Sequence, residues 1–443
     1  MTTFHCQLAW LGDAAADVER DLAVHVDGDR IAAVEAGVAP SAGAVRLPGL
    51  TVPGFANAHS HAFHRALRGR THGGRGSFWT WRRQMYDVAA TLDPDTYLLL
   101  ARATFAEMVL AGISCVGEFH YLHHDVDGRP YGDPNEMGHA VLQAATEAGL
   151  RITLLDTCYL QGGFGRPPDG VQRRFSDGDA DAWAARVGAI TPGSGARVGA
   201  AIHSVRAVDP ASMAAVASWA TEHATALHAH VSEQPIENEQ CRATHGATPT
   251  ELLDAAGALG ERFTAVHAIH LTDHDVQLLG GQQCSCCCCP TTERDLADGI
   301  GPWRALDDAG ARLTIGSDSH AVIDALEEAR GVELHERLRT SERGHHRPAD
   351  LLQMAGRNGH LSLGWPDAGV IAPGALADLT TVGLDSVRTV GADESSALAT
   401  VVFAATAADV RHVVVGGRVV VADGHHTTID AATELRAALR ALP

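Results

Sequence analysis

Short apolar segments alternate with longer segments of helical periodicity from residue 51 onward, and this alternation narrows the choice of fold. Eight of the apolar segments are strand-like: residues 50–58, 114–119, 151–157, 198–203, 226–231, 264–267, 283–288 and 312–316. Strands that are joined by right-handed helical crossovers form a parallel sheet, and eight such units can close the sheet into a barrel. The sequence therefore predicts an α/β protein, a (β/α)8 TIM-type barrel.

The starts of three intervening helices are marked by Asp-Pro pairs, which begin at Asp93, Asp133 and Asp209. An aspartate before the first turn accepts hydrogen bonds from unpaired backbone amides, and proline at the first helical position loses no hydrogen bond. Glycine permits the left-handed conformation that ends many helices, so the second of these helices is expected to stop at Gly149. A last helix is expected over residues 431–442.

Both chain ends have a different pattern, in which short strands are separated by turns. Gly416 and Gly417 stand between two valine runs and indicate a β-hairpin. Neither end is long enough to form a stable hydrophobic core alone. We therefore predict one small composite β-domain from residues 1–50 and 368–443, which flanks a barrel spanning residues 51–367.

The sequence contains no lysine, and all 34 of its cationic side chains are arginine. This composition excludes Schiff-base chemistry, a phosphate-loop lysine and a metal pair bridged by a modified lysine. The formal net charge of −20 disfavours nucleic acid and membrane surfaces as partners, because both attract a basic face. The sequence has neither a secretory signal nor a run of ~18 apolar residues, so a cytoplasmic protein is expected.

Histidine and aspartate residues stand at the carboxyl ends of several predicted strands. His59 and His61 are two positions apart, so on a strand their side chains point the same way with Cα atoms ~6.5–7 Å apart. His230, His267 and Asp318 end later strands, and in a closed barrel the carboxyl ends all face one mouth. Such nitrogen and oxygen donors suit zinc or ferrous iron, and three or four of them leave room for a bound water. The pattern predicts a metal-activated hydrolase.

Two other segments are expected near this mouth. Residues 162–170 are rich in glycine and proline, which is typical of a surface loop. His120, His123 and His124 flank Tyr121, and we interpret them as loop residues and not as metal ligands.

Five of the nine cysteines are bunched at residues 284–289. A disulfide framework is implausible in a long chain with an odd number of cysteines. Neighbouring residues on a strand point to opposite faces, so this run cannot enclose one ion tetrahedrally. Buried cysteine also behaves as a small apolar residue. We expect a buried strand here, with a thiolate metal cluster as the alternative.

Seven short motifs are scattered through the chain: His-Ser-His-Ala-Phe at 59–63, Trp-Thr-Trp-Arg at 79–82, Phe-His-Tyr at 119–121, His-Ser-Val-Arg at 203–206, His-Val-Ser-Glu at 230–233, Pro-Thr-Thr-Glu at 290–293 and Gly-Ser-Asp-Ser-His at 316–320. Together they resemble the amidohydrolase superfamily and, within it, the formimidoylglutamate deiminases. The histidine and aspartate set is common to the superfamily. The Trp-Thr-Trp-Arg, Phe-His-Tyr and His-Ser-Val-Arg motifs narrow the resemblance to the deiminases.

This resemblance implies hydrolysis of N-formimino-L-glutamate to N-formyl-L-glutamate and ammonia, a step of histidine degradation, by a homodimeric enzyme. It implies one zinc ion per chain, or iron in its place, bound by His59, His61, His230 and Asp318. Proton transfer would involve Glu233, His267 and Asp318. The substrate is a small anion, and the resemblance assigns its contacts to His64, Arg82, Tyr121, His203 and Arg206. The family usually has glutamine at the position of His64.

Two other functions stay open at this point. A deaminase of a purine, pyrimidine or aminotriazine ring needs amide and aromatic groups to hold a flat ring, whereas two arginines and a tyrosine suit carboxylates. A non-catalytic metal-binding protein would use the cysteine run, would bind several ions per chain, and would not depend on Glu233.

Overall fold

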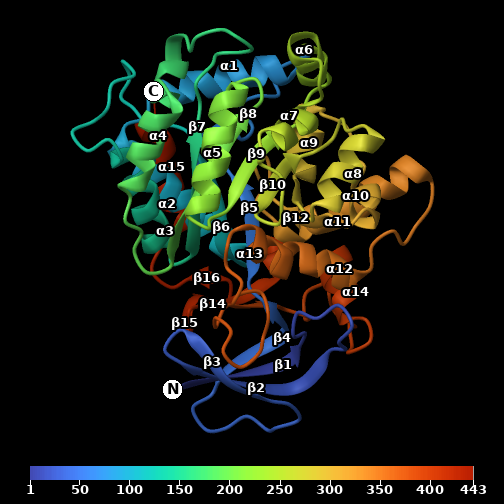
Figure 1. Cartoon of the computed structure of the whole chain (residues 1–443). Coiled ribbons are helices and arrows are strands. Elements are labelled where there is room, and N and C mark those ends of the chain that lie inside the picture. Colours follow the sequence, from blue (N-terminus) through green and yellow to red (C-terminus); the bar gives the residue numbers. More distant parts are fainter. Residues whose placement is uncertain (443) are drawn as a thin grey trace.

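The computed structural model describes residues 1–442 and contains two eight-stranded sheets (Figure 1). In the first sheet, successive strands pair in parallel in the order of the sequence. These strands are β5 (Phe55–Ser60), β6 (Ile113–His120), β7 (Arg151–Cys158), β8 (Ala196–Ser204), β9 (Leu227–Val231), β10 (Phe263–His267), β11 (Ser285–Cys288) and β12 (Arg312–Ile315). A parallel bridge between Ser60 and Asp318 joins β5 to the segment after β12 and closes the barrel. The predicted (β/α)8 barrel is confirmed.

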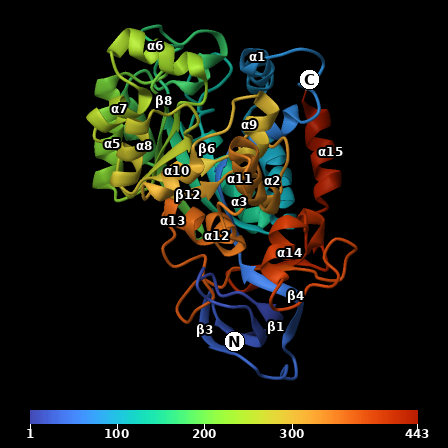
Figure 2. The ribbon, with the colours of Figure 1, turned by 90° about the vertical axis from the view of Figure 1, so that its right-hand side faces the viewer.

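Helices in the crossovers surround this barrel (Figures 1 and 2). They are α1 (Phe78–Ala89), α2 (Pro94–Leu110), α3 (Glu136–Ala148), α4 (Ala180–Gly188), α5 (Pro210–Glu222), α6 (Pro235–His245), α7 (Pro249–Ala255), α8 (Asp273–Gly281), α9 (Pro290–Leu296), α10 (Trp303–Asp308) and α11 (Ala325–Thr340). Asp93 and Asp209 accept backbone N–H bonds at the starts of α2 and α5, as predicted. Helix α3 begins later than its Asp-Pro pair indicated, because Asn135 is the residue before its first turn. It ends at Gly149, whose φ is 79°.

The second sheet is mixed and combines both chain ends. Its strands are β1 (Thr2–Ala9), β2 (Glu19–Asp27), β3 (Arg30–Glu35), β4 (Val45–Pro53), β13 (Leu379–Val382), β14 (Val410–Val415), β15 (Arg418–Ala422) and β16 (His425–His426). Strand β4 lies between β1 and β13, so the N-terminal and C-terminal parts share one sheet. Gly416 and Gly417 connect β14 to β15 with φ values of 55° and 74°, which confirms the predicted hairpin.

The chain passes from one sheet to the other at Gly54. The single strand predicted over residues 50–58 is therefore wrong: β4 ends at Pro53 in the mixed sheet and β5 begins at Phe55 in the barrel. A β-carbon at Gly54 would lie 2.3 Å from the Ser114 hydroxyl, so the crossing has no room for a side chain. Periodicity could not locate this break because residues 50–58 are buried throughout.

Four short helices complete the C-terminal third of the chain: α12 (Pro348–Gln353), α13 (Gly359–Ser362), α14 (Ala397–Phe403) and α15 (Ala431–Ala441). Helix α15 lies beside α2 on the barrel (Figure 2), where Arg102 donates a hydrogen bond of 2.8 Å to Glu434. The helix predicted over residues 431–442 thus forms, but it packs on the barrel and not on the mixed sheet.

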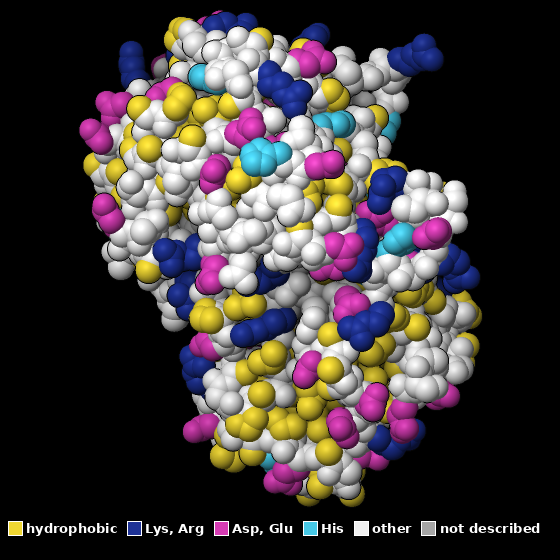
Figure 3. All heavy atoms as spheres, turned by 45° about the vertical axis from the view of Figure 1, so that its right-hand side comes forward, with side chains coloured by type: hydrophobic (Ala, Val, Ile, Leu, Met, Phe, Trp, Pro, Cys, Tyr) yellow, Lys and Arg dark blue, Asp and Glu magenta, His cyan; other side chains and the backbone are white. Residues whose placement is uncertain are grey.

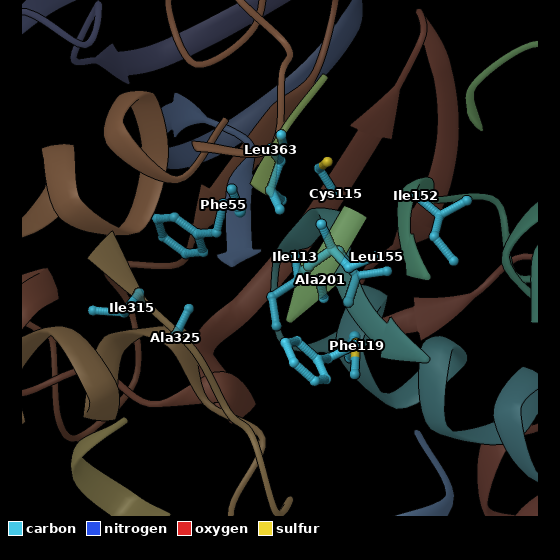
Figure 4. Close-up of a cluster of buried hydrophobic side chains, with 14 of the residues drawn as sticks. Phe55, Ile113, Cys115, Phe119, Ile152, Leu155, Ala201, Ile315, Ala325 and Leu363 are labelled. Carbon is cyan, nitrogen blue, oxygen red and sulfur yellow. The ribbon is translucent and has the colours of Figure 1, made fainter. Parts of the chain in front are cut away.

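Apolar side chains of neighbouring strands and of the segment after α13 build the core of the barrel. Figure 4 shows Phe55, Ile113 and Leu155 converging from β5, β6 and β7, close to Leu363, which follows α13. All four are buried. A β-carbon at Gly117 would lie 2.4 Å from a methyl group of Leu363, so this glycine lets the helical layer approach the strands.

A buried ion pair links the two sheets. Arg151 at the start of β7 donates bonds of 2.7 and 3.1 Å to the two carboxylate oxygens of Asp378, just before β13. Asp378 also accepts a 2.7 Å bond from the Gly416 backbone. On the face seen in Figure 3, acidic and basic side chains are interspersed over both parts of the molecule. Among residues 1–442, no helix combines the length and hydrophobicity needed to cross a bilayer.

Candidate metal centre and active site

The carboxyl ends of the barrel strands bring the predicted metal ligands together. The Nε2 atoms of His59 and His61 lie 3.3 and 3.4 Å from the same Asp318 oxygen. The Nε2 atoms of His59 and His230 are 3.1 Å apart. Donor atoms of His59, His230, His267 and Asp318 all lie within 4.8 Å of one another. The four predicted ligands therefore converge, and His267 stands beside them.

Two backbone carbonyls orient the imidazole rings of this group. His61 donates through Nδ1 to the carbonyl of Phe119 at 2.9 Å, and His230 donates through Nδ1 to the carbonyl of His203 at 2.8 Å. These bonds leave both Nε2 lone pairs directed at the shared point. Burial and the neighbouring imidazoles hold the pKa of both rings well below its usual range, so they are neutral, as ligands must be.

The donor chemistry fits a small divalent cation. Imidazole nitrogen and carboxylate oxygen are the ligands found in catalytic zinc and non-haem iron sites. His59 is fully buried behind the others, and its Nε2 faces the Nε2 lone pair of His230 across 3.1 Å. A cation at this point would bind the Nε2 lone pair of His230, which otherwise faces only another imidazole nitrogen in a buried space. We conclude that the group is suited to one metal ion.

Among residues 1–442, five of the eleven non-glycine residues with positive φ lie at the same strand ends. Ser232, His267, Ala268, Asp318 and His320 all have φ between 41° and 69°, although none is glycine. Such conformations cost about 1–3 kcal/mol each and persist where the surroundings impose them, commonly at functional sites. The closing bridge imposes the one at Asp318, whose N–H donates to the His59 carbonyl at 3.0 Å. Part of the backbone strain therefore lies at the predicted metal group.

Glu233 and His267 form a second buried pair beside the metal group. Glu233 Oε1 and His267 Nε2 lie 3.8 Å apart, and His267 Nε2 is also 3.8 Å from Asp318. Burial raises the pKa of Glu233 to about 7, with Asp318 adding to the rise and His267 opposing it. Burial alone would lower the pKa of His267, but the carboxylates of Glu233, Glu293 and Asp318 raise it well above its usual range. A carboxyl poised near neutrality can both accept and donate a proton.

A cavity of about 140 Å³ opens above these groups. All five predicted substrate contacts line it: His64, Arg82, Tyr121, His203 and Arg206. The Tyr121 hydroxyl and His64 Nε2 are 2.9 Å apart. The Arg82 guanidinium lies 5.1 Å from the rings of both Trp79 and Tyr86, which hold it in the wall of the cavity.

The structure adds cavity residues that were not predicted from the sequence. Arg166 lies in the loop over residues 162–170, which borders the cavity as expected for a loop near the mouth. Tyr159 follows β7, and Gln172 donates bonds of 2.9 and 3.0 Å to the hydroxyls of Tyr159 and Tyr86. The only sequence signal for Arg166 was its position in the glycine-rich loop. No local signal distinguished Tyr159.

Two of the three histidines around Tyr121 lie in a loop, as predicted, and one does not. His120 is the last residue of β6, whereas His123 and His124 are in the loop that follows it, and all three side chains are buried. His123 shares a hydrogen bond of 2.9 Å with the Thr157 carbonyl and lies 3.8 Å from Asp156, whose carboxylate is bound by Arg186. The His120 ring packs outside the barrel wall because alternate residues of β6 point away from the cavity.

The cysteine run forms the buried strand that we predicted. All five of its sulfurs are buried and reduced, and β11 passes through them. Strand alternation separates them: Cys284, Cys286 and Cys288 pack in the main core, whereas Cys287 and Cys289 pack with Ala58 and Val266 inside the barrel. The five sulfurs therefore do not face one common point.

Comparison with known proteins places this geometry in a family. The amidohydrolase family matches residues 50–420. Formimidoylglutamate deiminase of Pseudomonas aeruginosa is 36% identical over 421 residues, 92% of each chain. The 8-oxoguanine deaminase of the same species is 32% identical over 409 residues, 89% of this chain and 87% of that protein.

Solved structures agree with the fold. A crystal structure of an amidohydrolase from Brucella melitensis has a TM-score of 0.91 at 31% identity, and the match covers 100% of this chain and 99% of that chain. Atrazine chlorohydrolase from Arthrobacter aurescens, solved with zinc, has a TM-score of 0.88 at 22% identity over 100% of both chains. At that identity the second likeness shows the fold alone.

Proposed function

Because this chain belongs to the amidohydrolase family, we propose that it is a metal-dependent deiminase that hydrolyses N-formimino-L-glutamate to N-formyl-L-glutamate and ammonia. One observation carries the proposal: Arg82, Arg166 and Arg206, from three separate segments, line one small cavity that also contains the metal group. The chain has a net charge of −20, so this gathering of cations is local. A guanidinium binds a carboxylate through two parallel hydrogen bonds, and the proposed substrate has two carboxylates.

His59, His61, His230 and Asp318 would hold the metal. Zinc, when bound at such a site, lowers the pKa of a water molecule from 15.7 to about 7 and so supplies a nucleophile. Asp318 has a carboxylate oxygen free of the two histidines, and this oxygen is directed toward His267, 3.8 Å away. It is placed to accept the proton of the attacking water. His267 would stabilise the negative charge that gathers near the attacked carbon.

Glu233 would transfer that proton to the leaving nitrogen. Attack of water on the formimino carbon forms a C–O bond, and the C–N bond to the terminal nitrogen then breaks. Nitrogen leaves as neutral ammonia only when it has been protonated. Glu233 lies on the cavity wall, and its pKa of about 7 lets it take a proton and return it within one turnover. The remaining product is the N-formyl amino acid.

The relatives leave ring deamination as the rival function. The 8-oxoguanine deaminase acts on a flat purine, and Trp79, Tyr86 and Tyr159 would suit stacking on such a ring. In this chain, however, Trp79 and Tyr86 are already stacked on Arg82. We therefore assign the aromatic wall to positioning the guanidinium.

The test is ammonia release from N-formimino-L-glutamate beside 8-oxoguanine and 5′-methylthioadenosine, with metal content assayed on the same sample. We expect release from the first compound alone. The Glu233→Gln variant should lose about 10²–10⁴-fold in turnover while it retains its metal. The matched Glu239→Gln change, on the exposed side of α6, should alter neither quantity. Ammonia release from a ring amine alone would contradict the proposal, and full turnover in Glu233→Gln would contradict the mechanism.

A further inference from the structure

The cysteine run contains one sulfur whose surroundings differ from those of the other four. Cys289 follows the end of β11 and precedes the first turn of α9, and Glu293 is the fourth residue of that helix. The Cys289 backbone N–H donates to Glu293 Oε1 at 2.9 Å, which fixes the carboxylate against the helix start. The thiol of residue 289 and the carboxylate of residue 293 therefore lie at the same end of one helix.

The third member of this cluster is His267, through the ring nitrogen that faces away from the metal group. Its Nδ1 lies 3.5 Å from Glu293 Oε1, and the ligand atoms of His267, Cys289 and Glu293 all lie within 4.8 Å of one another. All three residues are at most 1% exposed. The His267 Nε2, by contrast, faces Glu233 and Asp318 in the active site. One imidazole thus joins two clusters through its two nitrogens.

Two polar atoms of this cluster are unsatisfied. Among residues 1–442, Glu293 Oε2 has no hydrogen-bond partner, and His267 Nδ1 has only the 3.5 Å ion-pair contact with Glu293 Oε1, which is long for a hydrogen bond. A buried polar atom without a partner costs about 1–3 kcal/mol, so the pair marks a place where a cation would be stabilised. The Cys289 sulfur has only a long 3.9 Å contact with the Cys287 carbonyl and is available as a third donor.

The spacing suits zinc or a related thiophilic ion. Zinc binds nitrogen and carboxylate oxygen at about 2.0–2.2 Å, so two such ligands in a tetrahedron lie about 3.4 Å apart. The 3.5 Å between His267 Nδ1 and Glu293 Oε1 matches that separation. Burial raises the pKa of the Cys289 thiol well above its usual range, so the free site holds a neutral thiol, and binding of a cation would release its proton.

We propose that Cys289, Glu293 and Nδ1 of His267 form a second, inhibitory site for a thiophilic divalent cation such as Cd²⁺ or excess Zn²⁺. Because the neighbouring carboxylates raise the pKa of His267, a cation at Nδ1 must displace the proton of an imidazolium ring. The bound cation then replaces the ring charge that Nε2 presents to Glu233 and Asp318 in the active site. The inhibitory consequence rests on the proposed function of His267. The binding itself does not.

The experiment adds Cd²⁺ to protein already loaded with one zinc ion per chain. Bound cadmium and released zinc are counted after dialysis, and thiolate-to-metal charge transfer is followed by ultraviolet absorption. We expect about one further equivalent of cadmium, with the thiolate absorption, in the wild type and in Cys288→Ala. Cys288 is the matched control, because it is an adjacent buried cysteine on the opposite strand face. The further equivalent and the absorption should be lost in Cys289→Ala.

Absence of the further equivalent in the wild type, or its survival in Cys289→Ala, would overturn the site. Glu293→Gln keeps the side-chain volume and should weaken cadmium binding by at least about tenfold, which provides a second variant if Cys289→Ala fails to fold. The cadmium count stands whether or not the protein deiminates formiminoglutamate. In an active preparation, cadmium that binds with the thiolate signal but leaves turnover unchanged would refute the inhibitory consequence.

Discussion

Arg206 supports two predictions at once, because it faces both the cavity and a buried carboxylate. Its Nε lies 4.0 Å from Glu237, whose side chain is completely buried, while Arg206 itself is 12% exposed. Burial raises the pKa of Glu237, and the charge of Arg206 opposes that rise. Replacing Arg206 with methionine keeps much of the side-chain bulk but removes the cation that Glu237 faces.

The cost of this change has an upper limit. An unpaired buried carboxylate can always accept a proton, and protonating a carboxyl of ordinary pKa ~4.3 at pH 7 costs ~3.7 kcal/mol. Part of this cost is already present in the wild type, because the pKa of Glu237 is raised even beside Arg206. We therefore expect Arg206→Met to lower the free energy of unfolding by ~2–3 kcal/mol at pH 7.

The sign of the pH dependence follows from the direction of the shift. A carboxyl whose pKa is raised in the folded state binds more protons there than in the unfolded chain, so stability falls as pH rises above ~4.3. The deficit of Arg206→Met should thus be larger at pH 8 than at pH 5. Adding Glu237→Gln should restore most of the lost stability, because the neutral amide needs no counter-charge.

Substrate binding should respond differently from stability. Loss of one charge-assisted contact to a substrate carboxylate costs ~1.5–3 kcal/mol, or roughly 10- to 150-fold in kcat/KM. The second change, Glu237→Gln, should leave this loss in place. Urea unfolding at the two pH values and steady-state kinetics measure the two effects on the same samples. An equal stability deficit at both pH values, or one that persists in the double variant, would refute the assignment of Glu237 as its source.

Two further predictions concern stability and the metal. Asp378→Asn should lower the free energy of unfolding by ~3–5 kcal/mol, because it leaves the buried Arg151 without its counter-charge between the two sheets. Asp367→Asn breaks an exposed ion pair with Arg30 and should cost less than ~1 kcal/mol. Urea midpoints compare the two variants. Removal of the metal by a chelator should lower the thermal midpoint, and re-addition of zinc should restore it in proportion to the logarithm of its concentration, as a ligand that binds only the folded state must. A thermal midpoint that is unaffected by chelation would contradict the metal site.

The sequence predicted the barrel because apolar strands alternate with helical segments, and several strands also end in a recognisable residue. His59, His230 and His267 mark the ends of β5, β9 and β10. The family resemblance drawn from such motifs is confirmed by the match over residues 50–420. The division of residues 50–58 at Gly54 escaped prediction, because a strand buried on both faces has no alternation that could show where it changes sheet.

The site residues on strand ends were predicted from the sequence, whereas those in loops were not. The residues on strand ends converged as expected, since the barrel places all carboxyl ends on one rim. Arg166 and Tyr159 were missed because they lie in loops, and the path of a loop depends on contacts with distant segments. Glu293 was visible in the Pro-Thr-Thr-Glu motif, but only its position at the helix start shows that it faces His267.

Closure of the barrel and assembly of the metal group involve the same residue. Asp318 pairs with Ser60 in the bridge that closes the sheet, and the His61 N–H donates to the Asp318 carbonyl at 3.3 Å. The Asp318 carboxylate meanwhile contacts the side chains of His59 and His61 on the opposite side of that seam. A cation held by these three side chains would therefore connect the first and last segments of the barrel. It follows that metal binding should protect the backbone amides of Asp318 and His61 from hydrogen exchange more than those of β7, which lies far from the seam.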